Sequence, residues 1–198
     1  MLRKNNFSKN YLDEVIRICN KISISDIEDV VKYILKVKLN KGRIFFLGVG
    51  GSAANASHAV NDFRKICNIE AYCPSDNVSE LTARTNDDGF DYIFQDWFKT
   101  SKVNKKDLIL IFSVGGGNLK KKVSVNIINA LKYANTNKIK SICFVGKKDG
   151  YAFKNSSIPV YFNIYNKKLV TPISEAMQAL MWHAIVSDPE LQLNKTKW

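Results

Sequence analysis

The chain of 198 residues is 45% apolar and 24% charged, the composition of a globular protein with enough length for one generous core. Its formal net charge of +12 admits three kinds of anionic partner: nucleic acid, a membrane surface or a small substrate. The basic residues are spread over the whole length, and the only tight run is Lys120-Lys121-Lys122, which disfavours nucleic acid and membrane. A solvated lysine-rich surface and attraction of a small anion both remain open.

Two further patterns indicate in which cellular compartment the protein is found. No apolar stretch is long enough to span a bilayer, and no apolar core of a signal peptide follows Met1. The four cysteines form no Cys-x-x-Cys pair, and each lies within or beside an apolar run. These patterns predict a cytoplasmic protein whose cysteines are reduced packing residues.

Two amphipathic segments open the chain before any strand. They are predicted as helices over residues 11–21 and 27–39, and Ser25 and Asp26 are the predicted caps of the second. Residues 1–40 thus form a helical lead to the repeating pattern of residues 41–198. The whole chain, residues 1–198, is predicted to be one domain.

After residue 41, short apolar strands alternate with helical segments. The predicted strands cover residues 44–47, 69–73, 108–112, 141–145 and 160–162. The predicted helices cover residues 53–66, 78–85, 91–99, 120–134, 151–155 and 171–187, and the aromatic residues of the third are spaced for packing. This alternation predicts an α/β fold, a three-layer αβα sandwich with a five-stranded parallel sheet of order 2-1-3-4-5.

Two glycine-rich loops follow the first and third strands. Backbone N–H groups of glycine can approach an anion closely, and the N-terminus of a following helix adds partial positive charge. In the predicted strand order, the crevice of the sheet opens between the carboxyl ends of these two strands. The loops therefore predict one phosphate-binding pocket, with these candidate residues: Gly50, Gly51, Ser52, Ser113, Gly115, Gly116, Gly117 and Asn118.

The two histidines of the chain each share a predicted helix with a carboxylate. His58 and Asp62 are four residues apart, so they lie on one face of their helix. Glu175 and His183 are two turns apart and rotated by roughly 80°, which still allows them to flank one pocket. Imidazole and carboxylate groups are suitable ligands for zinc or a similar divalent ion. For a histidine taken alone, the alternative is a hydrogen-bonded structural role.

Taken in order, these motifs resemble the sugar isomerase (SIS) domain family, and most closely its phosphoheptose isomerase branch. The motifs are Gly-x-Gly-Gly-Ser after a strand, a histidine six residues later, Asn-Asp-x-Gly-Phe, a serine-containing glycine loop, and a last helix that ends in histidine. The resemblance covers nearly the whole chain. It implies conversion of sedoheptulose 7-phosphate to D-glycero-D-manno-heptose 7-phosphate by a homotetramer with active sites at subunit contacts, in which the leading helices build the oligomer core.

The resemblance also implies roles for individual residues. Ser52 and Asn86 match positions that bind the substrate. The implied metal ligands, with zinc as the ion, are His58, Asp62, Glu175 and His183. The implied catalytic residues are Asp62, Glu175, His183 and Asp87, with Asp62 or Glu175 as the base and His183 as its acid partner.

Several positions depart from the family pattern. Asp replaces Glu at position 62, Glu replaces Gln at 175, and Val49 replaces an asparagine. The second loop lacks hydroxyls that the family uses for phosphate, and Asn118 or Lys120 could supply donors instead. A second interpretation therefore stays open, a non-catalytic sugar-phosphate-binding regulator or adaptor on the same scaffold. A dinucleotide-dependent dehydrogenase is disfavoured because the first loop lacks the Gly-x-Gly-x-x-Gly spacing.

Overall fold

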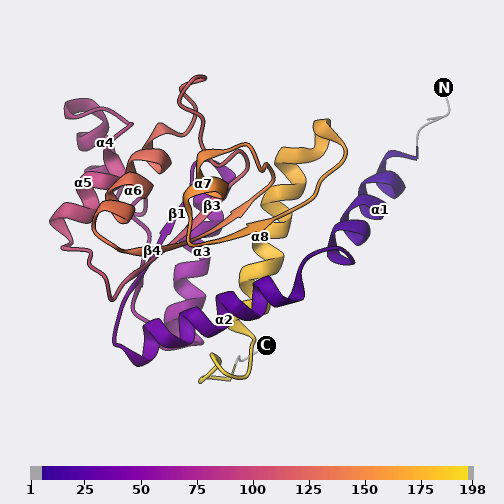
Figure 1. Cartoon of the computed structure of the whole chain (residues 1–198), viewed down its shortest axis with the longest axis horizontal. Coiled ribbons are helices and arrows are strands. Elements are labelled where there is room, and N and C mark those ends of the chain that lie inside the picture. The colour runs from indigo at the N-terminus through magenta and orange to yellow at the C-terminus, as the bar shows by residue number, and fades with distance from the viewer. Residues whose placement is uncertain (1–5, 196–198) are drawn as a thin grey trace.

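Five parallel strands form one sheet in the order β2-β1-β3-β4-β5, which confirms the predicted topology (Figure 1). The computed structural model describes residues 6–195, so the residues next to Met1 lie outside the description. β1 pairs with β3 from Ile44 opposite Leu108 to Leu47 opposite Ile111, and both strands therefore end at the same edge. The strands are β1 (Ile44–Leu47), β2 (Ala71–Tyr72), β3 (Leu108–Ser113), β4 (Lys140–Val145) and β5 (Ile158–Tyr161).

Helices cover both faces of this sheet. Ile44 and Phe46 pack into a core with α2, α3 and α8, whereas Phe45 and Leu47 pack into a second core with α5, α6 and α7. Because both faces are buried, the strands appear in the sequence as continuous apolar runs. The helices are α1 (Phe7–Cys19), α2 (Ile24–Leu39), α3 (Gly51–Lys65), α4 (Val78–Asp87), α5 (Ile93–Thr100), α6 (Val125–Thr136), α7 (Tyr151–Asn155) and α8 (Val170–Val186), the last preceded by a 3-10 turn, η1 (Lys167–Leu169).

The two leading helices differ in how they are held. α2 packs on the sheet through Val30, Ile34 and Val37, whereas α1 extends away from the body in Figure 1. The predicted caps of α2 were wrong, since the Ser23 side chain accepts the N–H of Asp26 (3.2 Å) and the helix begins three residues before the predicted start. Ser23 and Ser25 both have a side chain that can cap a helix, and the extended backbone at Ser23 makes that residue the cap.

The segment around the lysine run also differs from the prediction. Lys120, Lys121 and Lys122 do not begin a helix, because they lie in a turn closed by two backbone hydrogen bonds between Asn118 and Val123 (2.9 and 3.1 Å). Ser124 has a left-handed backbone with φ 49°, which a right-handed helix cannot pass through. α6 therefore starts only at Val125.

The aromatic residues of α5 confirm the packing interpretation in part. Phe94 and Phe98 are buried against the sheet, Trp97 is half-buried, and Tyr92 is exposed just before the helix. None of the helices within residues 6–195 combines the length and apolarity needed to cross a bilayer.

Candidate functional site

The first glycine loop connects the end of β1 to the start of α3. Gly50 caps the helix with a backbone of φ 64°, a conformation that favours glycine, and its carbonyl accepts the N–H groups of Ala53 and Ala54. The first N–H groups of a helix have no partner within the helix, so this loop offers donors to an anion. Ser52 is buried at the beginning of α3.

Glu175 lies directly beside this loop. A Cβ atom built on Gly51 would come within 2.5 Å of Oε2 of Glu175, so the carboxylate touches the first turn of α3. The next turn of α3 fixes the position of α8 relative to α3, because Nδ2 of Asn55 donates to the carbonyl of Glu175 (2.9 Å) and to Oε1 of Gln178 (3.1 Å). The N-terminal ends of α3 and α8 therefore lie together at the first loop.

The second glycine loop is held in place by its own backbone groups. The Ser113 hydroxyl accepts the N–H of Gly116 (3.0 Å), and the carbonyls of Gly116 and Gly117 accept N–H groups of α7. Asn118 uses its side-chain oxygen to accept the N–H of Lys121 (3.0 Å). Much of this loop's hydrogen bonding thus maintains its shape, and its remaining donors face a small cavity.

That cavity has a volume of about 110 Å³. Two of its lining residues are lysines that were not among the predicted site residues. Lys121 and Lys147 line it together with Gly115, Gly117 and Asn118, and the carboxylate of Asp149 in the same lining offsets part of their charge. Lys147 follows the carboxyl end of β4, the neighbour of β3, so the same topological rule that indicated the loops could have found it. The arrangement suits a phosphate group, since lysine binds phosphate as a point charge beside backbone donors.

A separate cluster joins α3 and α8 further along both helices. One ligand atom from each of three side chains, His58, Asp62 and His183, lies within 4.8 Å of the others. Asp62 is only 3% exposed, and its Oδ1 accepts Nδ2 of Asn61 (2.8 Å). This is a buried carboxylate with a fixed orientation, flanked by two exposed imidazoles.

Neighbouring groups orient both imidazoles. Nδ1–H of His183 donates to the carbonyl of Ala179 (2.8 Å), and this tautomer leaves the Nε2 lone pair free. Trp182 is fully buried behind the pair, with its ring centroid 4.6 Å from that of His58 and 3.4 Å from that of His183. Two nitrogens and one oxygen, with hydrogen bonds that orient Asp62 and His183, match the donor set of a zinc site.

Three of the four predicted metal ligands have their ligand atoms close together, and Glu175 is not part of that group. Glu175 lies eight residues before His183, which places it roughly 12 Å away along the axis of α8. α3 runs in the same direction, so Gly51 and Glu175 are level with each other, as are His58 and His183. The structure thus joins His58, Asp62 and His183, and it places Glu175 with the glycine loop.

The predicted pair Asn86 and Asp87 occupies a third place. Nδ2 of Asn86 donates to Oδ1 of Asp87 (2.7 Å) at the exposed end of α4. α4 packs through Leu81 on the face that carries α5 and α6, whereas α3 and α8 cover the other face. Within residues 6–195, no contact of Asp87 with His58, Asp62 or His183 is present.

Comparison with known proteins shows the family of this chain. The model of the SIS domain family matches residues 10–146. A phosphoheptose isomerase of Aliarcobacter butzleri is 30% identical over 172 residues, which cover 83% of this chain and 85% of that protein. Lincomycin biosynthesis protein LmbN of Streptomyces lincolnensis is 25% identical over 154 residues, which are 73% of this chain but only 54% of that protein.

A solved structure extends the likeness to three dimensions. The phosphoheptose isomerase of Neisseria gonorrhoeae superposes with a TM-score of 0.76 at 25% identity. The superposition covers 90% of this chain and 95% of that chain. The likeness therefore includes the N-terminal helices as well as most of the sheet.

Proposed function

Because this chain belongs to the SIS domain family, we propose that it is a sugar-phosphate aldose–ketose isomerase. The substrate we assign is sedoheptulose 7-phosphate, and the product is D-glycero-D-manno-heptose 7-phosphate, as the named relatives suggest. The observation that carries the proposal is the cluster of His58, Asp62 and His183. Binding a sugar phosphate needs only glycine loops, whereas moving a proton needs oriented acid and base groups.

The reaction transfers a proton between adjacent carbons through an enediolate. It needs a base at the carbon and a proton donor at the oxygen that becomes negative. We assign the donor role to His183, which must then carry a proton on Nε2, the ring nitrogen that its bond to Ala179 leaves free; a zinc ion on the same nitrogen would exclude this role, so the acid and ligand roles of His183 are alternatives. The base is Asp62 or Glu175, and the variants Asp62→Asn and Glu175→Gln separate them by their effect on proton exchange. Asp87 remains a proposed active-site carboxylate.

A zinc ion fits the donor set of the cluster, and His58, Asp62 and His183 would hold it. Bound there, zinc would supply a positive charge that polarises the sugar carbonyl. Asn61 and Ala179 would then keep Asp62 and His183 in their ligating orientations.

We further propose a homotetramer whose active sites combine residues of two chains. In one chain the Glu175 carboxylate lies against Gly51, and the backbone positions of Glu175 and His183 are roughly 12 Å apart along α8. His58 and His183 are exposed on the outside of α3 and α8, where a second copy could bring its glycine loops. The leading helix α1 exposes Phe7, Leu12 and Ile16 by 62%, 59% and 57%, which is apolar surface available for association.

The assay is incubation with sedoheptulose 7-phosphate in deuterated buffer, with and without zinc, followed by NMR. Deuterium at the carbon next to the carbonyl, together with aldoheptose formation, is the expected result. Mixed tetramers test the shared site: Glu175→Ala and His183→Ala chains are each expected to be inactive and to regain activity when they are assembled together. No recovery in verified mixed tetramers would place both residues in one chain's site.

One observation favours a second candidate, a sugar-phosphate-binding regulator. The second loop has Val114, Gly115 and Asn118 where the family pattern carries hydroxyls, and Val49 is 36% exposed in the first loop. Binding of the sugar phosphate without deuterium exchange, in the presence of zinc, would establish this candidate in place of the isomerase.

A further inference from the structure

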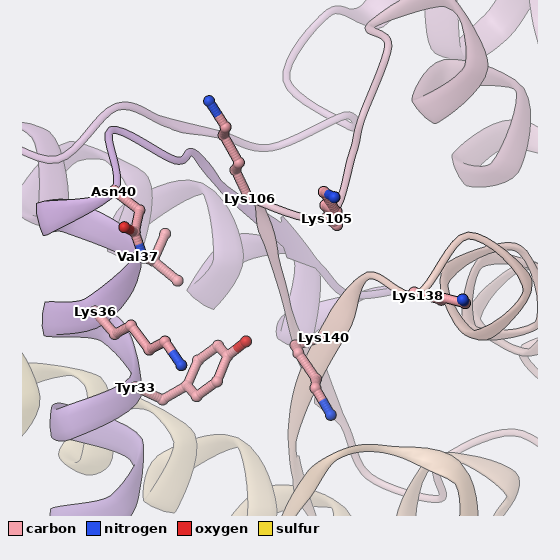
Figure 2. A pocket seen from close by; sticks show the side chains of 8 residues that line it. All are labelled: Tyr33, Lys36, Val37, Asn40, Lys105, Lys106, Lys138 and Lys140. Carbon is pink, nitrogen blue, oxygen red and sulfur yellow. The ribbon is translucent and has the colours of Figure 1, made fainter.

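A lysine-rich cavity lies at the end of the sheet opposite to the glycine loops. Its volume is about 370 Å³, within the range of small-molecule sites. Its lysines come from α2, from the loop before β3, and from the turn and first residue that begin β4 (Figure 2). The five are Lys36, Lys105, Lys106, Lys138 and Lys140.

No carboxylate lines this cavity, whose other lining residues are Tyr33, Val37 and Asn40. Throughout residues 6–195, no ion pair joins any of the five lysines to an acidic side chain. In Figure 2 the Lys36 side chain extends toward Lys140, whereas the Lys106 and Lys138 side chains extend away from them. The five like charges repel each other, and an anion bound beside them would relieve that repulsion.

The nearest acidic residue in the sequence, Asp107, is already committed elsewhere. Its Oδ2 accepts Nη2 of Arg43 (2.8 Å) and the N–H of Asn104 (2.9 Å), and its Oδ1 accepts the N–H of Arg43 (3.0 Å). Asp107 is 2% exposed and forms an ion pair with Arg43, so its negative charge does not neutralise the lysines of the cavity. The same bonds hold the loop that carries Lys105 and Lys106.

The backbone of this region is also tightly packed. A Cβ atom on Gly42 would come within 2.0 Å of the Lys106 carbonyl, so the segment after α2 lies directly on the loop before β3. Two walls of the cavity are thereby held together by backbone contact. The lysine side chains remain exposed on this scaffold, and Figure 2 shows Lys36 and Tyr33 directed from α2 toward Lys140.

We propose that this cavity binds a small molecule carrying a chain of two or more phosphate groups. Lysine is a flexible point charge that can follow phosphate groups spread along a chain. The ammonium groups lie on separate walls, so only a few of them could contact a single phosphate. A chain of several phosphates could contact more of them at once. The half-buried ring of Tyr33 offers an apolar face to a nucleoside, so a nucleoside triphosphate and inorganic tripolyphosphate share the required chemistry.

This site is distinct from the proposed sugar-phosphate site. The glycine loops follow the carboxyl ends of β1 and β3, whereas the lysines lie at the amino ends of β3 and β4 and on α2. A six-residue strand separates the two edges by roughly 20 Å. The inference therefore does not depend on the isomerase proposal.

Calorimetric titration with tripolyphosphate, ATP and orthophosphate tests the proposal. The pocket variant is Lys36→Gln/Lys106→Gln/Lys140→Gln, which removes one cation from each wall. The matched control is Lys132→Gln/Lys154→Gln/Lys168→Gln, which removes the same charge from exposed lysines that do not line the cavity. Circular dichroism and thermal melts confirm that both variants are folded.

Tripolyphosphate is expected to bind the unaltered protein, and the pocket variant should weaken this binding by at least about tenfold. The control should stay within about twofold at the same ionic strength. If ATP binds more tightly than tripolyphosphate, the nucleoside also contacts the site; equal affinity identifies the phosphate chain as the whole ligand.

Four results would overturn the proposal. The first is an equal loss in both variants, which would indicate general attraction to a basic protein. The second is orthophosphate binding as tightly as tripolyphosphate, and the third is no binding of either chain phosphate. The fourth is a short single-stranded oligonucleotide that binds at this cavity far more tightly than tripolyphosphate, which would identify a nucleic-acid surface.

Discussion

The carboxylate of Glu175 lies against Gly51, in space that a larger residue would fill: an added Cβ would meet Oε2 at 2.5 Å. Gly51→Ala should therefore displace this flexible side chain and reduce proton exchange on the sugar phosphate. The backbone at Gly51 is not left-handed, so stability should change by less than about 1 kcal/mol.

A double-mutant cycle checks that this effect passes through Glu175. In a Glu175→Ala background, Gly51→Ala should cause no further loss of exchange, because the displaced carboxylate is already gone. Equal losses in both backgrounds would show that the methyl group acts on the loop itself.

The zinc proposal depends on the charge of Asp62. Asp62→Asn keeps the size of the side chain and removes the anionic oxygen, so zinc retained after gel filtration should disappear, as measured by plasma emission spectrometry. Glu190→Gln, at an exposed position outside the cluster, is the matched control and should keep its zinc. Zinc retained at the same level in Asp62→Asn would remove this residue from the ligand set.

Lys121 and Lys147 give a prediction about phosphate binding. Lys121→Gln/Lys147→Gln should raise KM for the sugar phosphate by roughly two- to fivefold for each exposed charge removed. kcat should be unchanged, because in the proposed site both cations would contact the phosphate and not the reacting carbons. The control is Lys132→Gln/Lys154→Gln, and a fall in kcat without a change in KM would contradict the assignment.

The attachment of α1 should depend on pH through Glu14. The hydrogen bonds from the Arg17 side chain lower the pKa of Glu14 from 4.5 to about 2, and the N–H of Tyr165 also donates to its carboxylate (2.6 Å). A carboxyl group whose pKa is lowered in the folded state stabilises that state above its unfolded pKa. This contribution is lost as the pH falls from about 4.5 to about 2.

Urea unfolding of the unaltered protein and of Glu14→Gln at pH 6, 4 and 3 measures this contribution. The stability difference should be about 1 to 2 kcal/mol at pH 6 and should shrink at pH 3. A stability difference that is constant across the three pH values would show that the contact with Arg17 does not lower the pKa of Glu14.

The cysteines should differ sharply in reactivity. Burial raises the pKa of Cys67 and Cys73 to about 11 and that of Cys143 to about 12, so their thiolates are scarce at neutral pH. Cys19 is half-buried on α1. Iodoacetamide at pH 7.5 should label Cys19 first and the other three only after denaturation, as intact-mass spectrometry would show; rapid labelling of Cys143 in the folded protein would contradict this.

The elements of the fold that follow local rules were predictable from the sequence. Alternating short apolar runs and helices indicated the sheet order, and two glycine loops indicated which strand ends to inspect. The spacing of His58 and Asp62 placed both on one helix face, and their atoms do lie together. These relationships depend on the period of a helix or a strand, which neighbouring residues specify.

Tertiary packing decided the rest. The sequence did not reveal that α3 and α8 run in the same direction with His58 level with His183, which separates Glu175 from the cluster. The sign of φ at Ser124 determined where α6 begins, and a serine is compatible with either sign in a turn. Lys36, Lys106 and Lys140 are up to about a hundred residues apart in the chain, and only the packing of α2 beside the starts of β3 and β4 brings them around one cavity.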